Sequence, residues 1–390
     1  MTSSSSGHSI GRRSLIQALG IGAGASLTGC LSQIGGDDSG DGYKLGFAAM
    51  AAPSPWHRMW MRTHEWYAKD QGHEIIVSNA EFEADQQTRQ VQNMLNKGID
   101  GLIISPVSSG GSVDVIENAL DEGVAVMTNN SSVFTGEIPL FVAFGNYSGG
   151  YLAGEEIAAK VNDLYGGGRV LDIMGDQTSE TAQLRSQGFT DAVEEEGLTV
   201  ARHIAAKWSV EKAIEKTTAF LQQDSDIQGM YGAWGAATEA MRQSLDRQDM
   251  LVERGNDGYI PTGVIDAVPV ALENIRNGYL EVAVDQPMPF YGPVTIEYMT
   301  DYLDADKDES VLPSQGETIG ADQLSIEPEE EKGPEGHTNL WKRDYWAPAE
   351  VQLFSNEGTN YHPYFRMEPL AVTKENVDAE YLWAKYVDLL

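Results

Sequence analysis

The most constraining feature of this sequence is a regular alternation between short apolar runs and longer amphipathic segments. Runs rich in isoleucine, leucine and valine, such as 101–105, are followed by stretches such as 112–122 in which apolar residues recur at helical spacing. Strands that alternate with helices form βαβ units, and βαβ units build parallel sheets. The alternation therefore predicts an α/β fold with parallel sheets.

One apolar run ends abruptly in polar side chains. The segment Gly123-Val-Ala-Val-Met-Thr-Asn-Asn-Ser-Ser132 is typical of a buried parallel strand whose end carries amides and hydroxyls. Ligands of open α/β sheets bind at the carboxyl edge of the strands. The segment therefore predicts a ligand-binding edge, and we expect the rest of the chain to hold a second such edge opposite it.

The alternation runs through the chain twice, which predicts two lobes: 43–144 plus 287–311, and 145–286. A crossing into the second lobe is predicted at 141–151. A return crossing is predicted at Pro287-Met-Pro289, and the following helix is expected to pack on the first lobe. Strands are predicted at 43–49, 74–79, 101–105, within 123–132, and at 169–174, 199–206, 229–231, 262–265 and 281–285. Helices are predicted at 56–71, 85–97, 112–122, 149–164, 178–196, 209–224, 236–247, 267–277 and 290–304.

Residues 312–365 depart from this rhythm. We interpret them as an insertion packed across the lobes, because so many aromatic side chains seldom remain exposed. The last residues, 366–390, are expected to pack on the lobes as a C-terminal segment. The aromatic residues of the insertion are Trp341, Tyr345, Trp346, Phe354, Tyr361, Tyr364 and Phe365.

The first 30 residues are typical of an export signal and not of a folded domain. Arg12-Arg13 is followed by a short, mildly apolar segment, which suits a twin-arginine signal and is too weak for a membrane span. Leu27-Thr-Gly-Cys30 is similar to a lipobox, and Cys30 is the only cysteine. We expect export by the twin-arginine pathway, a lipid anchor at Cys30 on the outer face of the cytoplasmic membrane, and a flexible acidic linker at 31–42. The alternative is a coincidental cysteine in a leader.

The chain is strongly acidic, with a formal net charge of −33 over 390 residues. Nucleic-acid binding needs a basic surface, so this charge argues against a nucleic-acid partner. Disorder is an alternative explanation of the charge, but the apolar runs are too frequent and regular for it. A solvated acidic surface suited to high salt, as in a halophilic protein, is the preferred interpretation.

The motifs of common enzymes are missing from the sequence. No phosphate-binding loop, no Gly-x-Ser-x-Gly elbow and no zinc-type histidine pair occurs, and Cys30 is unavailable as a nucleophile if it carries lipid. Paired carboxylates are abundant, but with 59 acidic residues chance pairs carry little weight. We therefore expect a protein without catalytic residues, cofactor or metal site.

From Leu45 to about Leu303 the chain resembles the sugar-binding receptors of ABC importers, the type I periplasmic-binding-protein family. That family implies two Rossmann-like lobes joined by three hinge crossings, a sugar held between them, and an ABC permease as partner. We also expect a monomer. The matching stretches are Pro53-Ser-Pro-Trp-His57, Gly98-Ile-Asp-Gly-Leu-Ile-Ile-Ser-Pro106, Asn146-Tyr-Ser-Gly-Gly-Tyr-Leu-Ala-Gly154, Ser179-Glu-Thr-Ala-Gln-Leu-Arg-Ser-Gln-Gly-Phe189 and Lys207-Trp-Ser-Val-Glu-Lys-Ala213.

The resemblance places two aromatic residues on opposite sides of the ligand. The aromatic residue after the first strand falls on Trp56, with His57 beside it and Ser54 where the family often has asparagine. The aromatic residue of the second lobe falls on Trp208. Tryptophan planes suit a sugar ring, whose axial C–H groups form an apolar face. The alternative for both tryptophans is ordinary packing.

Further positions around the ligand follow from the same resemblance. The family's acidic residue falls on Asn130 and its arginine partner on Ser131, while Trp234 stands where asparagine is usual. The sites therefore imply a polyhydroxylated ligand and do not single out ribose. The remaining candidates are Gln183 with nearby Arg185 in place of a second-lobe arginine, Asp266, and Gln286.

Two of these candidates have alternative interpretations. Asp266 could be the N-cap of a helix that begins at Ala267. Asn130 lies in glycosylation sequons, and a glycan there would exclude a ligand role.

At the level of the whole protein, the sequence predicts an anchored receptor that captures a sugar or a related polar small molecule. Rivals are a module that binds a nucleoside or signal for a sensor, and a secreted lipoprotein hydrolase.

Overall fold

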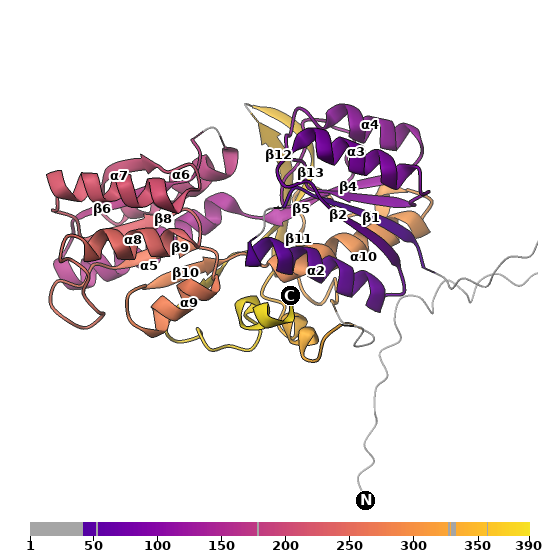
Figure 1. The fold of residues 1–390 in the computed structure, drawn as a ribbon. Helices are drawn as coiled ribbons and strands as arrows, with labels where there is room; N and C mark the ends of the chain where they lie inside the picture. The colour runs from indigo at the N-terminus through magenta and orange to yellow at the C-terminus, as the bar shows by residue number, and fades with distance from the viewer. Residues whose placement is uncertain (1–41, 52–53, 178, 327, 329–332, 357) are drawn as a thin grey trace, which may run out of the picture. The chain divides into compact units, whose positions relative to one another are not determined.

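We describe a computed structural model of the chain, which covers residues 42–51, 54–177, 179–326, 328, 333–356 and 358–390. The predicted signal at 1–30, including Cys30, lies outside the described residues. The described chain forms two sheets with helices packed on them (Figure 1). Within it, no helix combines the length and the apolar character that a membrane crossing requires.

The first sheet has eight strands in the order β11-β12-β13-β5-β4-β3-β1-β2. The five strands from β5 to β2 are parallel, and β13 adds to β5 in parallel. Its strands are β1 (Lys44–Ala49), β2 (Glu74–Asn79), β3 (Gly101–Ile104), β4 (Ala125–Asn129), β5 (Phe141–Phe144), β11 (Thr318–Ile319), β12 (Ala349–Asn356) and β13 (Thr359–Met367). Its helices are α2 (Pro55–Asp70), α3 (Ala84–Leu95), α4 (Val113–Asp121) and α10 (Tyr291–Asp304).

The second sheet has six strands in the order β14-β10-β9-β8-β6-β7, parallel except for β14. Its strands are β6 (Arg169–Met174), β7 (Thr199–Ala205), β8 (Gly229–Gly232), β9 (Thr262–Ile265), β10 (Val282–Asp285) and β14 (Leu370–Val372). Its helices are α5 (Asn146–Tyr165), α6 (Glu180–Glu195), α7 (Val210–Gln223), α8 (Ala237–Asp246) and α9 (Pro269–Arg276). The two sheets confirm the predicted α/β class and the predicted alternation.

Helix α2 shows how the sequence sets local structure and packing. Ser54 caps its first turn, Pro55 occupies the first helical position, and the apolar residues at helical spacing are buried. Trp60 Nε1 donates to Asn129 Oδ1 at 3.0 Å, and Asn129 Nδ2 donates to the Tyr291 carbonyl oxygen at 2.9 Å. This buried amide joins α2, β4 and α10, which confirms that the helix after the return crossing packs on the first lobe.

Three connections join the two sheets, as the resemblance implies. The first runs from β5 to α5, which packs on β8, β9 and β10. The second runs from β10 through a short 3-10 helix, η1 (Met288–Phe290), to α10. The third runs from β13 in the first sheet to β14 in the second. Two lobes, each built on a largely parallel sheet and linked by three crossings, agree with the architecture that the resemblance implies.

The aromatic segment after α10 adds to the first sheet. Strands β12 and β13 form an antiparallel hairpin, shown in yellow in Figure 1, and β13 pairs with β5. Burial of the aromatic run is confirmed for Trp341, Tyr345, Trp346, Phe354 and Phe365. The remaining short 3-10 helices are η2 (Glu309–Val311), η3 (His337–Trp341) and η4 (Trp383–Leu389).

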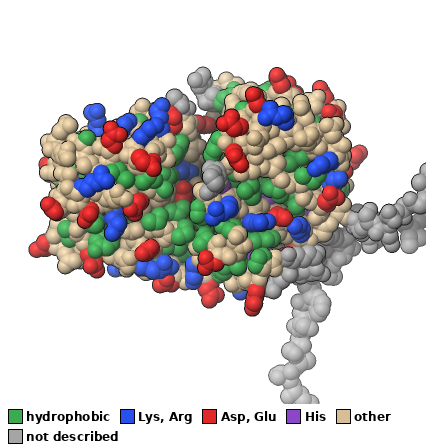
Figure 2. Space-filling model, in the orientation of Figure 1, with side chains coloured by type: hydrophobic (Ala, Val, Ile, Leu, Met, Phe, Trp, Pro, Cys, Tyr) green, Lys and Arg blue, Asp and Glu red, His purple; other side chains and the backbone are tan. Residues whose placement is uncertain are grey.

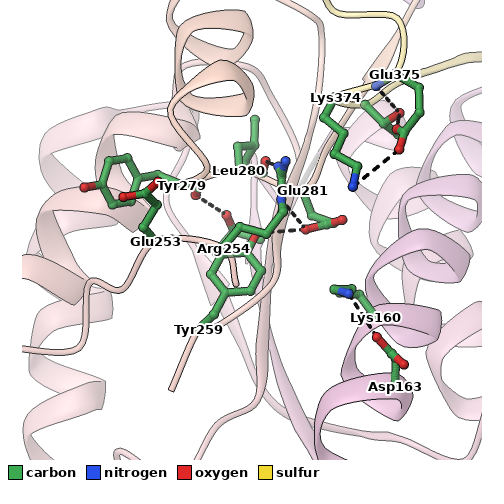
Figure 3. A network of polar contacts seen from close by, with 12 residues as sticks. Lys160, Asp163, Glu253, Arg254, Tyr259, Tyr279, Leu280, Glu281, Lys374 and Glu375 are labelled. Carbon is green, nitrogen blue, oxygen red and sulfur yellow. Dashed lines mark hydrogen bonds and ion pairs between the residues drawn. The ribbon is translucent and has the colours of Figure 1, made fainter. Parts of the chain in front are cut away.

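A polar network stabilises the end of the second sheet where β10 begins (Figure 3). Arg254 Nε donates to Glu281 Oε2 at 3.0 Å, and the Tyr259 hydroxyl donates to the same oxygen at 2.9 Å. The guanidinium group also donates to the Leu280 carbonyl. Because the network lies where β10 begins, it fixes the loop before β9 without entering the opposite, carboxyl edge of the sheet.

Candidate ligand-binding site

Polar and aromatic residues follow the carboxyl ends of strands in both sheets. At these positions Asn130, Lys207, Trp208 and Asp266 have left-handed backbones, with φ of 64°, 55°, 59° and 74°. Such conformations are uncommon for residues other than glycine, and for a bulky tryptophan they are exceptional. Backbone strain of this kind tends to cluster at functional sites. The strand ends are therefore the candidate site.

The first-lobe part of the site is an aromatic group at the start of α2. Trp56 is 7% exposed, and its ring lies 5.0 Å from His57 and 5.7 Å from Trp60 between centroids. Its buried Nε1 has no hydrogen-bond partner among the described residues. Buried donors are normally satisfied. The Trp56 N–H is thus a group that a ligand oxygen could pair.

His57 is a neutral polar group in this cluster. The Ser54 hydroxyl oxygen accepts from the His57 backbone N–H at 3.2 Å and lies 2.7 Å from His57 Nδ1. Burial lowers the pKa of His57 to about 4. The ring is therefore uncharged at neutral pH, and Ser54 is engaged in capping and in holding it.

Phe82 is a further candidate, which the sequence did not lead us to expect. It follows β2, is 50% exposed, has φ of 62°, and its ring packs edge-on against His57 at 5.9 Å. The sequence does contain a signal for this residue: Phe82 is a lone aromatic residue in the acidic segment Ala80-Glu-Phe-Glu83, directly after a strand. Its exposed ring extends the apolar surface of Trp56 and His57.

Asn130 lies half-buried after β4. Its N–H donates to the Val142 carbonyl at 2.9 Å, which fixes the left-handed turn. Its carboxamide has no hydrogen-bond partner within the described part of the chain. By contrast, the Ser131 hydroxyl donates to Pro106 O at 3.0 Å and lies 3.0 Å from the Ser105 hydroxyl. Asn130 is therefore free to bind a ligand, whereas Ser131 holds the loop.

The second-lobe part of the site is built on Trp208. A Cβ added to Gly175, just after β6, would lie 2.3 Å from Trp208 Cη2, so the indole packs directly on this glycine. Trp234, after β8, contacts Trp208 edge-on at 5.8 Å and 81°. Trp208 is half-buried, and Trp234 is 9% exposed. Both rings are held by their neighbours, and part of Trp208 remains accessible.

The two candidates on α6 lie in different environments. Arg185 is 6% exposed and donates to Asn146 Oδ1 at 2.9 Å and to the Ala233 carbonyl at 2.8 Å. Its guanidinium also lies 5.7 Å from the Phe144 ring centre. Arg185 therefore holds the first crossing against β8. Gln183 is exposed and donates to the Gln177 carbonyl at 2.8 Å.

Asp266 and Gln286 meet after β9 and β10. Gln286 Nε2 donates to Asp266 Oδ1 at 2.5 Å, and the Tyr291 hydroxyl donates to Gln286 Oε1 at 2.9 Å. The alternative that Asp266 caps a helix is wrong, because α9 begins at Pro269 with Val268 as its N-cap. The Phe144 N–H also donates to the Tyr291 hydroxyl, at 3.0 Å, so this chain links the first and second crossings.

The candidate residues thus lie in separate groups. Ser54, Trp56 and His57 form one group with Phe82, and Trp208 and Trp234 form another. Among the residues described, no ring contact joins Trp56 to Trp208. Asp266 and Gln286 form a third group. Aromatic faces suit the apolar faces of a polar ring compound, and amide and carboxylate groups suit its hydroxyls. The described residues contain no group of three His, Cys, Asp or Glu that could hold a metal ion.

Comparison with known proteins identifies the family of the chain. Residues 45–307 match the profile of the periplasmic binding protein domain. The ribose import binding protein of Bacillus subtilis is 26% identical over 265 residues, which are 68% of this chain and 83% of that protein. The Escherichia coli ribose import binding protein is 22% identical over 62% of this chain and 78% of its own length.

A solved structure shows the same fold. An ABC transporter periplasmic solute binding protein from Actinobacillus succinogenes, with bound D-allose, superposes with a TM-score of 0.65 at 16% identity. The match covers 86% of this chain and 99% of that chain.

Proposed function

Because the chain belongs to the periplasmic binding protein family, we propose that it is a receptor that captures a sugar or related polar small molecule for ABC import. The relatives just described are named as ribose import binding proteins, and the solved neighbour holds D-allose. These names support a sugar-like ligand for this chain. They leave its identity open, because the charged positions expected of ribose binding are replaced at Asn130 and Ser131.

The observation that carries the proposal is the way in which neighbouring residues hold the Trp208 indole. Its indole lies on Gly175 in a left-handed backbone and is braced edge-on by Trp234. A tryptophan held in this strained position at the carboxyl edge of a sheet provides a flat apolar surface for a sugar ring. Across the hinge, Trp56 would provide the second surface and its unpaired Nε1 a hydrogen bond to a ligand oxygen.

The polar ligand contacts that we propose are those of Asn130, Asp266 and Gln286, with His57 as a neutral partner. The lobes would close around the ligand by bending at the three crossings. Gln183, Arg185 and Ser54 would contribute less directly, since each is already engaged by a neighbouring group.

The cellular setting is part of the same proposal. We propose that the receptor is exported by the twin-arginine pathway, anchored outside the cell through lipidated Cys30, and monomeric when it meets the permease. The acidic composition, with a net charge of −33, supports function in high salt. Acidic and basic side chains are interspersed over the face shown in Figure 2.

We assign the protein binding and not catalysis. The relatives are binding proteins, and the only acidic candidate, Asp266, accepts a hydrogen bond from Gln286. If the protein were instead a hydrolase, a bound ligand would be turned over and alanine at Asp266 would abolish turnover. Mass spectrometry of a titrated ligand before and after incubation distinguishes the two.

The central test is calorimetric titration of the protein in molar KCl. The panel is D-ribose, D-allose, L-arabinose, D-fructose, myo-inositol and adenosine. We expect at least one saturable interaction, which Trp208→Ala weakens by about tenfold or more, since aromatic contacts contribute about 1 kcal/mol beyond buried area. Trp66→Ala is the matched control, because Trp66 is 6% exposed and its ring contacts His337. The absence of binding to every compound of the panel, or an equal loss of affinity in Trp208→Ala and Trp66→Ala, would count against the proposal.

A further inference from the structure

The β12–β13 hairpin makes a second set of contacts in addition to its pairing with β5. It lies beyond residues 45–307, which match the family profile. Its aromatic residues pack against the loop that follows β4: the Phe134 ring stacks with Tyr361 at 5.5 Å and with Phe354 at 6.2 Å. That loop begins with Asn130. A segment outside the family match therefore contacts the loop that carries a proposed ligand residue.

His362 in β13 is the polar centre of this contact. The ring is 1% exposed. Its Nδ1 lies 2.7 Å from the Thr135 carbonyl oxygen, and its Nε2 lies 2.7 Å from the Ser132 hydroxyl. One side chain thus holds the loop at two points, one on either side of Val133.

The chemistry of the partners fixes the direction of each hydrogen bond. A carbonyl oxygen can only accept, so His362 Nδ1 carries the proton. Burial lowers the pKa of His362 to about 4, so the ring is neutral at ordinary pH and Nε2 accepts from Ser132. The Ser132 oxygen, 2.7 Å from the Thr128 hydroxyl, in turn accepts from Thr128. The result is an ordered series of hydrogen bonds from Thr128 in β4 through Ser132 and His362 to Thr135.

The geometry points to a role for this series of hydrogen bonds in ligand binding, and that role rests on the proposed function. We infer that His362 is a positioning residue: through Ser132 and Thr135 it fixes the loop that holds Asn130 in its left-handed conformation. The β12–β13 hairpin is accordingly part of the binding apparatus of this protein. It is not a passive extension of the sheet.

Near Asn130 the loop is also held by the Ser131 hydroxyl, which donates to Pro106 O, so the contribution of His362 is greatest from Ser132 to Thr135. Asn130 is held by one backbone hydrogen bond to Val142, and Phe134 by one to the Ser109 carbonyl at 3.1 Å. Loss of the ring of His362 would leave the Ser132 hydroxyl and the Thr135 carbonyl buried without this partner. Buried polar groups that lose a partner favour local opening.

The test uses His362→Ala, His362→Gln and His337→Ala in the full chain. Glutamine retains an acceptor for Ser132 and should restore part of the effect. His337 is the matched control: it is also fully buried, its Nδ1 lies 2.7 Å from the Pro334 carbonyl, and its ring contacts Trp66 and Trp341.

Hydrogen–deuterium exchange is the first readout, and it needs no ligand. In His362→Ala we expect amides of residues 129–136 to exchange about tenfold to a hundredfold faster than in the native protein, with an intermediate rate in His362→Gln. Amides of β6 and β8, in the other sheet, report global stability and should change equally in both alanine variants. Unchanged exchange at 129–136, or an equal change in His337→Ala, would overturn the inference.

Affinity is the second readout, measured with the panel sugar that the native protein binds most tightly. We expect His362→Ala to weaken binding about tenfold or more and His337→Ala to leave it within about twofold. A loosened loop with unchanged affinity would refute the role in binding. If the native protein binds no panel sugar, the proposed function fails, and the exchange readout still decides whether His362 holds the loop.

Discussion

Asp285, the last residue of β10, should make the stability of this protein depend on pH in a way that a single substitution removes. The side chain is fully buried. Its Oδ1 accepts from the Ala267 N–H at 3.0 Å and from Trp383 Nε1 at 3.1 Å. Its Oδ2 has no hydrogen-bond partner among the described residues. Burial raises the pKa of Asp285 from 3.8 to about 7.

The sign of the effect follows from this raised pKa. Below pH 3.8 the carboxyl is protonated in both the folded and the unfolded state, so its ionisation does not affect the free energy of unfolding. Between pH 3.8 and about 7 the unfolded chain ionises while the folded chain keeps its proton, so stability falls as pH rises. Above that range the loss is complete and has an upper bound of about 4 kcal/mol.

Asp285→Asn keeps the acceptor oxygen and removes the buried charge. We expect the variant to match the native protein near pH 4 and to be more stable by up to about 4 kcal/mol at about pH 8. Urea unfolding at constant molar KCl, followed by circular dichroism across this pH range, measures the difference. The exposed Asp257→Asn variant controls for loss of one negative charge. A variant that is less stable at about pH 8, or a gain that is the same at every pH, would refute the reasoning.

Three further predictions concern the site and the surface. Gly175→Ala should displace the Trp208 indole, because the new Cβ would lie 2.3 Å from the ring, and sugar affinity should then fall at least about tenfold. Gly110→Ala is the control: its Cβ would meet only Phe134, at 3.9 Å, and sugar affinity should not change. Because burial lowers the pKa of His57 to about 4, the ring stays neutral from about pH 8 to about pH 5.5. In the Asp285→Asn variant, which lacks the neighbouring group with a pKa of about 7, calorimetry should therefore give one affinity over this range. Finally, the net charge of −33 should make the urea unfolding midpoint rise from dilute buffer to molar KCl; a flat response would contradict the expected salt adaptation.

Local sequence patterns were enough to predict the regular part of the fold. The predicted strands at 74–79, 169–174 and 262–265 match β2, β6 and β9, because short apolar runs bounded by turn residues leave few alternatives. The polar end of the segment 123–132 could be named for the same reason, since ligands bind at the carboxyl edge of a parallel sheet. The other site candidates were named from the family resemblance.

Long-range pairing could not be predicted in the same way. Nothing in the residues near His362 specifies that β13 pairs with β5, because such pairing depends on partners that are distant in the chain. The left-handed backbone of Trp208 was also hidden, since it depends on packing against Gly175. Arg185 was named as a ligand candidate, but its partners are the Ala233 carbonyl and Asn146, which only the folded chain brings near.

The third connection between the sheets has a practical consequence. Because β13 completes one sheet and β14 completes the other, the final third of the polypeptide contributes structure to both halves. Trp383, almost at the end, donates to Asp285 beside the second connection. Cutting the gene at one point therefore cannot yield either half intact. Isolating a single half for separate study would require joining pieces that are remote in the polypeptide.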